Sequence, residues 1–371
     1  MKSNGLKIDA AAVFFPVTVT GGVEAITTPD FFHADSGIQR GGFDSHGFRA
    51  GFGKGNGFAY HALIPQLGSL SPTPMPDNPQ RSQHLWFDLP DHRIVAISGR
   101  DAVAFAQAQT MNDVAALRDG EWHWNGWLTA KGRVIALFAV VRIDADTFWM
   151  VLPDADPETF AAQLRRFVFR SKVAITVRDD LQLAGRLRAS ELASGNHWTG
   201  DVLDAIELDL SGALVEGHLG RSLRIGPSAV ALADAAALQA WRLTDLQHGW
   251  PRLDPAQSEQ WTPQQLSLGR LRAYSVKKGC YPGQEIVART HFLGHAKRGL
   301  GLIHTAKSLT AGTELVSQGL TVGTVVSACG KTALAVLPLS LEQDALQNNE
   351  GPAANGEALW LLQALCEGLA R

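Results

Sequence analysis

The chain has 371 residues, of which 45% are apolar, and its 33 Lys and Arg stand against 36 Asp and Glu, a formal net charge of −3. This length favours about two to three domains, the composition is typical of a globular protein, and the charge balance argues against a general nucleic-acid coat. No apolar run approaches the ~18 residues that a membrane span needs.

The three cysteines, Cys280, Cys329 and Cys366, lie far apart and form no CxxC pair. This spacing argues against a disulfide framework and against a zinc or iron–sulfur site held by this chain alone. We therefore expect a reduced, cytoplasmic protein.

The first 80 residues differ in composition from the rest, with 12 glycines and 7 prolines but only 4 leucines. Such a segment cannot bury enough apolar surface to offset the entropy lost on ordering. We therefore predict that 1–80 is a disordered extension or a mis-called start, with Met75 as the alternative initiator. The first residues resemble a signal peptide only weakly, because Asp9 and Pro16 interrupt the apolar stretch.

The region 81–178 has the clearest pattern and is expected to form the first structural unit. Ser98 and Asp101 have the spacing of a capping box, and Pro157 suits the first turn of a helix. The expected elements are a strand His92–Ile97, a helix within 98–110, strands Trp122–Leu128, Val134–Ile143 and Phe148–Leu152, a helix within 156–170 and a strand Val173–Val177. The nearly all-apolar Val134–Ile143 should be central. This order is close to a ferredoxin-like layer of antiparallel strands under two helices.

Two further units are predicted, and the fold class is therefore α+β. In 179–290 the expected elements are strands Leu181–Leu187, Leu203–Leu208 and Leu223–Ile225 and a helix Asp234–Leu246. In 291–371 they are strands Gly301–His304, Leu320–Ser327 and Ala333–Leu337, at a spacing typical of a small barrel or sandwich. The terminal "ALWLLQALCEGLA" fits a strand or a helix.

The segment Tyr274–Thr290, "YSVKKGCYPGQEIVART", carries the densest chemistry. From Gly269 to Arg298 there are seven Lys and Arg and a single acid, Glu285. A charge run alone is better explained as a solvated basic face, and it indicates an anionic partner only when other features agree. Nearby lysines would lower the pKa of the Cys280 thiol, and the flanking glycines allow unusual backbone conformations or close ligand approach.

Residue chemistry alone leaves the role of Cys280 open. An inert thiol in a structural turn is one interpretation, and a Cys–His pair with His291 or His295 is another. The sequence contains no G-x-S-x-G, HExxH, Walker A or dinucleotide-binding fingerprint.

The motif "KKGCYPGQEIVAR" resembles the K-G-C-[YF]-x-G-Q-E signature of the YgfZ family. Members of this family are folate-binding proteins that act in the assembly or repair of iron–sulfur clusters. They are distant relatives of the glycine-cleavage T-protein, an aminomethyltransferase. Further segments resemble the family in the same order: "ISGRDAVAFAQAQTMNDVAAL", "LTAKGRVIALFAVVR", "RFVFRSKVAI", "WRLTDLQHGWPRLD" and "WTPQQLSL". The resemblance covers roughly 85–340 and leaves 1–80 outside.

The resemblance implies two ferredoxin-like units and a C-terminal β-barrel around a central hole, with tetrahydrofolate as the cofactor. It implies iron–sulfur enzymes, such as tRNA methylthiotransferases, as partners. Cys280 matches the family's required cysteine. Trp241 matches a tryptophan that relatives place against folate, where the aromatic face of the side chain can stack on the ligand. A second such tryptophan falls at His92, which is a departure. The other positions expected to bind the cofactor are Lys278, Gly279, Tyr281, Gly283, Gln284, Glu285, Gln109 and Asp113.

Two alternatives to an accessory factor remain at this stage. One is a folate-dependent one-carbon transferase or demethylase, using Glu285 or Asp113 as acid or base. The sequence has Ala136 and Leu137 where the T-protein family carries two aspartates. Because an apolar pair cannot deprotonate an amine, we do not expect aminomethyl transfer by the T-protein mechanism. The other is a tRNA-binding module that uses the basic strip.

Overall fold

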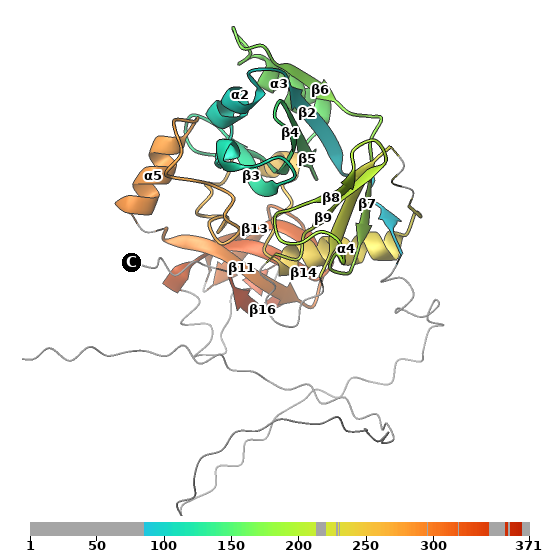
Figure 1. Cartoon of the computed structure of the whole chain (residues 1–371). Coiled ribbons are helices and arrows are strands. Elements are labelled where there is room, and N and C mark those ends of the chain that lie inside the picture. The colour runs from blue at the N-terminus through green and yellow to red at the C-terminus, as the bar shows by residue number, and fades with distance from the viewer. Residues whose placement is uncertain are drawn as a thin grey trace, which may run out of the picture. The chain divides into compact units, whose positions relative to one another are not determined.

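The computed structural model describes 85–212, 220–227, 229, 231–294, 296–317, 319–340, 353–354 and 357–365. These residues belong to one compact unit, Ser71–Arg371, drawn in colour in Figure 1. The predicted extension 1–80, Cys366 and His295 lie outside the described residues. The expected mixture of antiparallel sheets with few helices is confirmed.

The first sheet has the strand order β3-β4-β5-β2-β6. Its strands are β2 (Arg93–Ser98), β3 (Trp122–Leu128), β4 (Val134–Asp144), β5 (Thr147–Leu152) and β6 (Ala174–Val177). Every pairing in it is antiparallel. The apolar β4 is an interior strand as expected, although β5 and not β4 holds the middle position, because β2 returns beside β5.

The second sheet has the order β1-β7-β10-β9-β8. Its strands are β1 (Phe87–Asp88), β7 (Gln182–Arg186), β8 (Thr199–Asp201), β9 (Ala205–Asp209) and β10 (Ser222–Gly226). Strand β1 precedes the first sheet in sequence but pairs with β7 of the second. The segment Leu89–His92 therefore passes from one sheet to the other.

The C-terminal strands form a closed barrel in the order β11-β14-β13-β12-β15-β16. Its strands are β11 (Arg298–Thr305), β12 (Glu314–Ser317), β13 (Leu320–Cys329), β14 (Thr332–Pro338), β15 (Ala353–Ala354) and β16 (Glu357–Ala364). The terminal apolar segment is thus a strand, which pairs with β11 along its length.

Four α-helices and two short 3-10 helices are present in the described residues: α2 (Ala102–Gln109), α3 (Pro157–Arg165), α4 (Ala235–Gln247), α5 (Gln284–Phe292), Val114–Ala116 and Pro255–Gln257. Asp156 and Asp234 cap α3 and α4 through their side chains. The predicted capping box of α2 is wrong, because the Asp101 carboxylate accepts a hydrogen bond from the Lys172 N–H instead of capping the helix.

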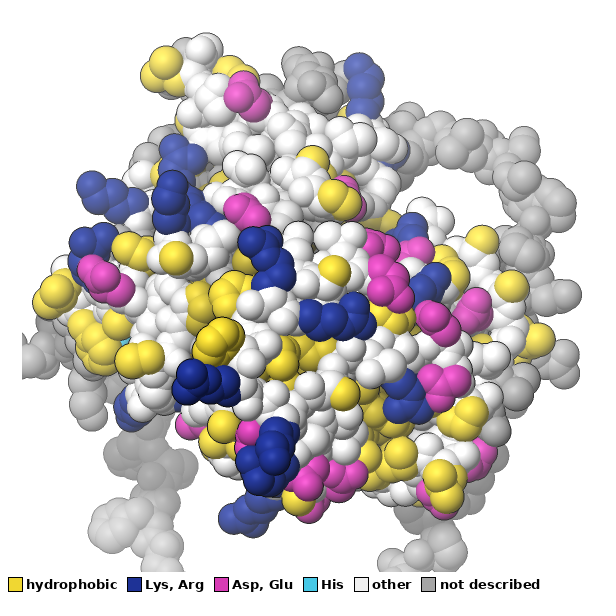
Figure 2. Space-filling model, turned by 90° about the horizontal axis from the view of Figure 1, so that it is seen from above, with side chains coloured by type: hydrophobic (Ala, Val, Ile, Leu, Met, Phe, Trp, Pro, Cys, Tyr) yellow, Lys and Arg dark blue, Asp and Glu magenta, His cyan; other side chains and the backbone are white. Residues whose placement is uncertain are grey.

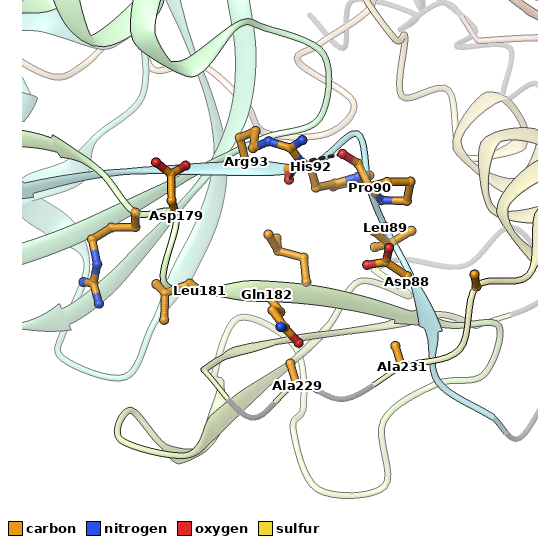
Figure 3. A pocket seen from close by; sticks show the side chains of 13 residues that line it. Asp88, Leu89, Pro90, His92, Arg93, Asp179, Leu181, Gln182, Ala229 and Ala231 are labelled. Atoms are coloured by element: carbon orange, nitrogen blue, oxygen red, sulfur yellow. Dashed lines mark hydrogen bonds between the residues drawn. The ribbon is translucent and has the colours of Figure 1, made fainter.

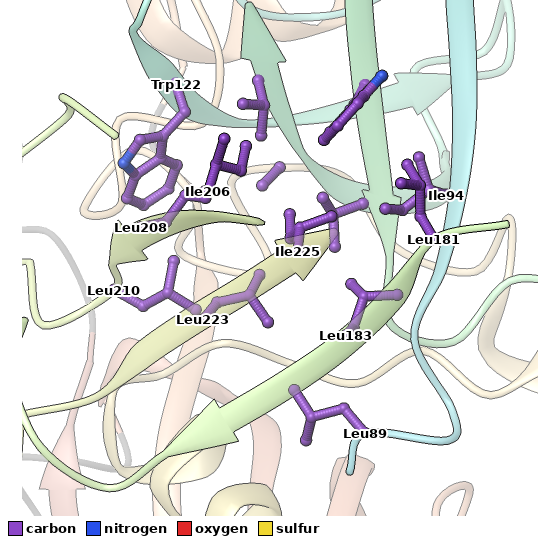
Figure 4. Packing of buried hydrophobic residues seen from close by; sticks show 14 of the residues in the cluster. Leu89, Ile94, Trp122, Leu181, Leu183, Ile206, Leu208, Leu210, Leu223 and Ile225 are labelled. Atoms are coloured by element: carbon purple, nitrogen blue, oxygen red, sulfur yellow. The ribbon is translucent and has the colours of Figure 1, made fainter. Parts of the chain in front are cut away.

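The two open sheets pack against each other through a shared apolar core. Figure 4 shows Ile94 and Trp122 of the first sheet opposite Ile206, Leu223 and Ile225 of the second. Helices α2 and α3 cover the other face of the first sheet. Helix α4 lies along barrel strands β13 and β14 (Figure 1) and sends Trp241 into the core between the sheets. Segments from all three sheets therefore converge around α4.

Candidate functional site

Three tryptophans surround a small cavity where β3, β10 and α4 meet, here called the tryptophan cavity. It is lined by one proline, four apolar residues and His92, Trp124, Trp241, Asp245 and Trp250. Its volume is about 20 Å³, which is enough for a single water. Trp124 and Trp250 stack with ring centroids 4.1 Å apart, and His92 meets Trp241 edge-on at 6.3 Å.

Two buried polar atoms in the wall of this cavity lack hydrogen-bond partners among the described residues: Nδ1 of His92 and Nε1 of Trp241. Burial, and then the charges of Arg252 and Arg221, lower the pKa of His92 well below 6.5. The imidazole is therefore neutral at pH 7. Because an unpaired buried polar atom is costly, both atoms are suited to a ligand with polar heteroaromatic edges.

A network of buried charges closes the cavity on the α4 side. Asp245 forms an ion pair with the buried Arg221, and its other oxygen lies 3.3 Å from Nη1 of Arg252. Arg252 also pairs with Asp154. Burial raises the pKa of Asp154 although Arg252 acts in the opposite direction. The network fixes α4, and with it Trp241, against the segment that follows β5.

A larger outer groove of about 600 Å³ lies on the other side of His92. Figure 3 shows Leu89, Pro90 and Arg93 along one wall and Leu181 and Gln182 along the other. His92 lines both the groove and the tryptophan cavity. His92 therefore lies between an open volume of ligand size and the much smaller tryptophan cavity.

The signature segment is anchored by a buried lysine. Nζ of Lys278 donates to the carbonyl oxygens of Thr110 and Asn112, at 2.6 and 2.8 Å. Burial lowers the pKa of Lys278 to about 8, although Asp113 raises it. The ammonium is thus held by two carbonyls of the loop after α2, and it is not turned toward the exposed Cys280 thiol as the sequence argument assumed.

Gly283 explains why the signature needs a glycine there. Its φ is +78°, and an added Cβ would lie 2.6 Å from Cα of Gly132 and from the carbonyl oxygen of Thr129. Gly132, with φ of +69°, in turn contacts Ile286 of α5. The two segments that carried much of the resemblance, the β3–β4 hairpin and the signature, therefore pack directly on each other.

The remaining signature residues divide into inward and outward groups. Tyr281 is buried, and its hydroxyl donates to the Ser275 carbonyl. Gln284 donates to the Lys278 carbonyl, so its amide is used within the loop. Gly279, Cys280 and Glu285 are exposed. At Gly279, where φ is not positive, an added Cβ would meet nothing within 4 Å, so neither strain nor packing in the described residues requires a glycine.

Gln109 and Asp113 do not line the tryptophan cavity, and Asp113 interacts electrostatically with Lys278. The Asp113 carboxylate accepts from the Gln107 amide at 2.9 Å, whereas the buried Oε1 of Gln109 has no partner among the described residues. Nearby, burial and then Lys278 lower the pKa of His123 to about 3. Asn125 accepts two backbone N–H groups through Oδ1, so its amide nitrogen donates to Nε2 of His123, which is unprotonated.

Asn112 links the two parts of the site. Its amide nitrogen donates to the Trp124 carbonyl at 2.9 Å, while its own carbonyl accepts from Lys278. The buried lysine of the signature segment is therefore two hydrogen bonds from the backbone of a cavity-lining tryptophan.

The structure thus brings Trp241 and His92 together, but no signature residue lines the tryptophan cavity. Sequence reasoning missed Asn112, Trp124, Trp250, Arg221 and Asp245. The "TMND" and "WHWNGW" stretches contain buried polar residues within apolar surroundings, a signal that could have identified Asn112 and Asn125. Nothing in the sequence pairs Arg221 with Asp245, because the contact depends on how α4 packs.

Ala136 and Leu137 are buried in β4, so no acid occupies the positions of the T-protein aspartates. The described part of the chain holds no group of three or more His, Cys, Asp and Glu suited to a metal ion. None of its helices combines the length and apolar character needed to cross a bilayer.

Comparison with known proteins places the chain in a family. The tRNA-modifying protein YgfZ of Escherichia coli O157:H7 is 30% identical over 229 residues, which cover 58% of this chain and 70% of the relative. The chain belongs to the YgfZ family. The YgfZ protein of Klebsiella pneumoniae is 28% identical over 243 residues, 62% of this chain and 74% of the relative.

Two more comparisons mark the limits of the YgfZ relationship. An uncharacterised protein of Haemophilus influenzae is 25% identical over 74% of this chain and 95% of its own length. The solved aminomethyltransferase T of the glycine cleavage system from Bartonella henselae has a TM-score of 0.57 at 15% identity, covering 77% of this chain and 87% of that one. At that identity the likeness concerns the fold alone. No family model matches the sequence.

Proposed function

We propose that this YgfZ-family chain is a tetrahydrofolate-binding accessory factor that acts in the cytoplasm on the assembly or repair of iron–sulfur clusters, with tRNA methylthiotransferases among its clients. The observation that carries the proposal is the tryptophan cavity, where stacking surfaces and two unpartnered buried polar atoms converge. In this proposal the two open sheets are ferredoxin-like units that, with the barrel, enclose the folate site, following the predicted boundaries 81–178, 179–290 and 291–371.

The residues present fit a pterin by chemistry. Trp241 offers an aromatic face, and the neutral His92 can donate or accept at the ring edge. A pterin is much larger than about 20 Å³, so binding requires the walls to move. Displacement of His92 would join the cavity to the outer groove of about 600 Å³ that it also lines.

In this proposal tetrahydrofolate supplies a reduced pterin that can carry one-carbon units, and the chain supplies its binding and a thiol. Lys278 holds the signature loop to the loop after α2, and Asn112 connects that anchor to the Trp124 backbone. Cys280 is exposed beside this anchor, where it can reach a client protein. A single thiolate falls short of the four usual cluster ligands, so any cluster would be shared with the client.

The folate arm is tested by calorimetric titration of the full chain with tetrahydrofolate. Trp241→Phe should weaken binding and Trp241→Ala should abolish it, because the stacking face shrinks and then disappears. Trp198→Phe is the control, since Trp198 donates to the Arg142 carbonyl and does not line the cavity. Equal affinities in the wild type and both Trp241 variants would place folate elsewhere.

The iron–sulfur arm is tested in a strain that lacks its own factor, with methylthiolated tRNA nucleosides as the readout. Wild-type protein should restore the modification and Cys280→Ala should not. Full restoration by Cys280→Ala would exclude the role assigned to this thiol. In the same cells, Cys329→Ala should behave as wild type, because Cys329 is half-buried and its thiol contacts the Gln239 carbonyl.

A further inference from the structure

Helix α5 ends in two adjacent exposed apolar side chains. Phe292 is 65% exposed and Leu293 84%, and the ring of Phe292 contacts that of its neighbour His291, with centroids 4.9 Å apart. The opposite face of the helix is already used, because Val287 is buried and Ile286 contacts Gly132. Scattered exposed apolar residues need no explanation, but an adjacent pair at the end of a packed helix offers a compact apolar projection.

Exposed, positively charged residues flank this projection in the sequence. Lys277, Arg289 and Lys297 are exposed, and in the part of the chain that the structure describes none of them lies within ion-pair distance of a carboxylate. Glu285 is the one acid between Gly269 and Arg298. Figure 2 shows Lys and Arg side chains over the left of this face, the side on which α5 lies in Figure 1, with few acidic side chains among them.

We propose that the C-terminal half of α5 is a docking surface for a protein whose complementary face is acidic around an apolar hollow. The inference rests on the proposed function, which requires a client protein, and it identifies the contact surface. Aromatic and arginine anchors inside a charged rim are the usual composition of such interfaces, and complementary charge guides the encounter.

A protein suits this surface better than RNA or a membrane. Phosphate contacts would use the cations but would leave Leu293 without a partner. Interfacial membrane helices bury a long apolar face, whereas the apolar face of this nine-residue helix is packed against its own chain. Cys280 and Gly279 lie exposed just before the helix, and the open space at Gly279 allows a partner backbone to approach the thiol.

The test measures binding of the full chain to a tRNA methylthiotransferase of the same organism by biolayer interferometry. Phe292→Ser should weaken binding at least about tenfold, as expected for an interface anchor. Arg289→Glu should weaken it and also flatten its dependence on salt. The matched controls are Phe169→Ser and Arg170→Glu, a pair that is also exposed, with Arg170 over the Phe169 ring at 5.3 Å; binding should stay within about twofold of the wild type.

Several results would overturn the docking surface. These are no binding by the wild type, equal losses in the Phe292 and Phe169 variants, or losses seen only toward tRNA or only toward anionic phosphatidylserine vesicles. Tetrahydrofolate titration separates this inference from the proposed function. If Phe292→Ser binds folate normally and its docking is unchanged, the docking surface alone is rejected. If the wild type binds no folate, the folate proposal is rejected, and the docking surface is judged by the binding measurements alone.

Discussion

The tryptophan cavity and the signature segment solve the problem of buried polar groups in opposite ways. In the cavity, His92 and Trp241 each keep a polar atom without a partner among the described residues. In the signature segment, the Lys278 ammonium, the Tyr281 hydroxyl and the Gln284 amide all bond to backbone carbonyls. A ligand gains most binding free energy where it can pair with buried polar atoms that lack partners. A region whose buried polar groups are all hydrogen-bonded is better suited to a rigid structural role.

The comparison assigns different tasks to the two regions. In our proposal the cavity binds the ligand, while the signature motif mostly forms a hydrogen-bonded loop that carries one exposed thiol. A motif of thirteen residues can therefore be highly specific for a family although some of its side chains, such as Lys278 and Tyr281, are buried and serve the structure of the loop. Three predictions test this division, ordered from the largest expected effect to the smallest.

Asp245→Asn should destabilise the protein most. The change leaves the guanidinium groups of Arg221 and Arg252 without their shared carboxylate, and breaking a buried ion pair costs about 3–5 kcal/mol. Urea unfolding at pH 7 measures the free energy of unfolding. Asp180→Asn, in the exposed pair with Arg178, should cost less than about 1 kcal/mol. Similar losses in the two variants would mean that the buried network does not stabilise the cavity wall.

Gly283→Ala should come next. The residue has φ of +78°, and its new Cβ would lie 2.6 Å from Gly132; a non-glycine residue in this conformation costs about 1–3 kcal/mol before the clash is counted. Gly279→Ala is the control four residues earlier, where the space is open, and a change within about 0.5 kcal/mol is expected. Thermal unfolding of both variants provides the measurement. Equal stability would contradict the close packing of the hairpin on the signature.

Lys278→Met should change the pH dependence of stability. The pKa of Lys278 is about 8 in the folded protein, whereas the ordinary pKa of a lysine, 10.5, applies to the unfolded chain. Between these two pH values the unfolded chain therefore binds more protons. The free energy of unfolding of the wild type should therefore rise with pH in this window, while the neutral amine keeps enough N–H groups for both carbonyls.

In Lys278→Met this rise should be absent, and the two unpaired carbonyls should cost about 1–3 kcal/mol at pH 7. Lys277→Met, at the exposed neighbouring position, controls for the loss of one positive charge. Urea unfolding at several pH values between 7 and 10 follows both variants. Parallel curves for the wild type and Lys278→Met would show that the ammonium is not held in the buried position described.

Local patterns in the sequence were enough for most elements. Most strands of the two open sheets, together with α3 and α4, were predicted within a few residues, because apolar periodicity and side-chain caps such as Asp156 and Asp234 depend on near neighbours. The short strands β1 and β8 were not predicted. The family was also predicted, because the signature motif and the segments upstream of it resemble the family in the same order. The terminal apolar stretch was undecided, because only its pairing with β11 makes it a strand.

Tertiary structure alone decided what these elements build. Strand β1 pairs with β7 of the second sheet, and the segment that follows β1 therefore places His92 between the groove and the cavity. The tertiary structure paired Arg221 with Asp245 and stacked Trp124 on Trp250, although each pair is far apart in sequence. It also turned Lys278 away from Cys280 and toward the carbonyls after α2. The sequence shows which charged and polar side chains a segment contains. Where those side chains point depends on which of them become buried, because a buried polar atom needs a hydrogen-bond partner.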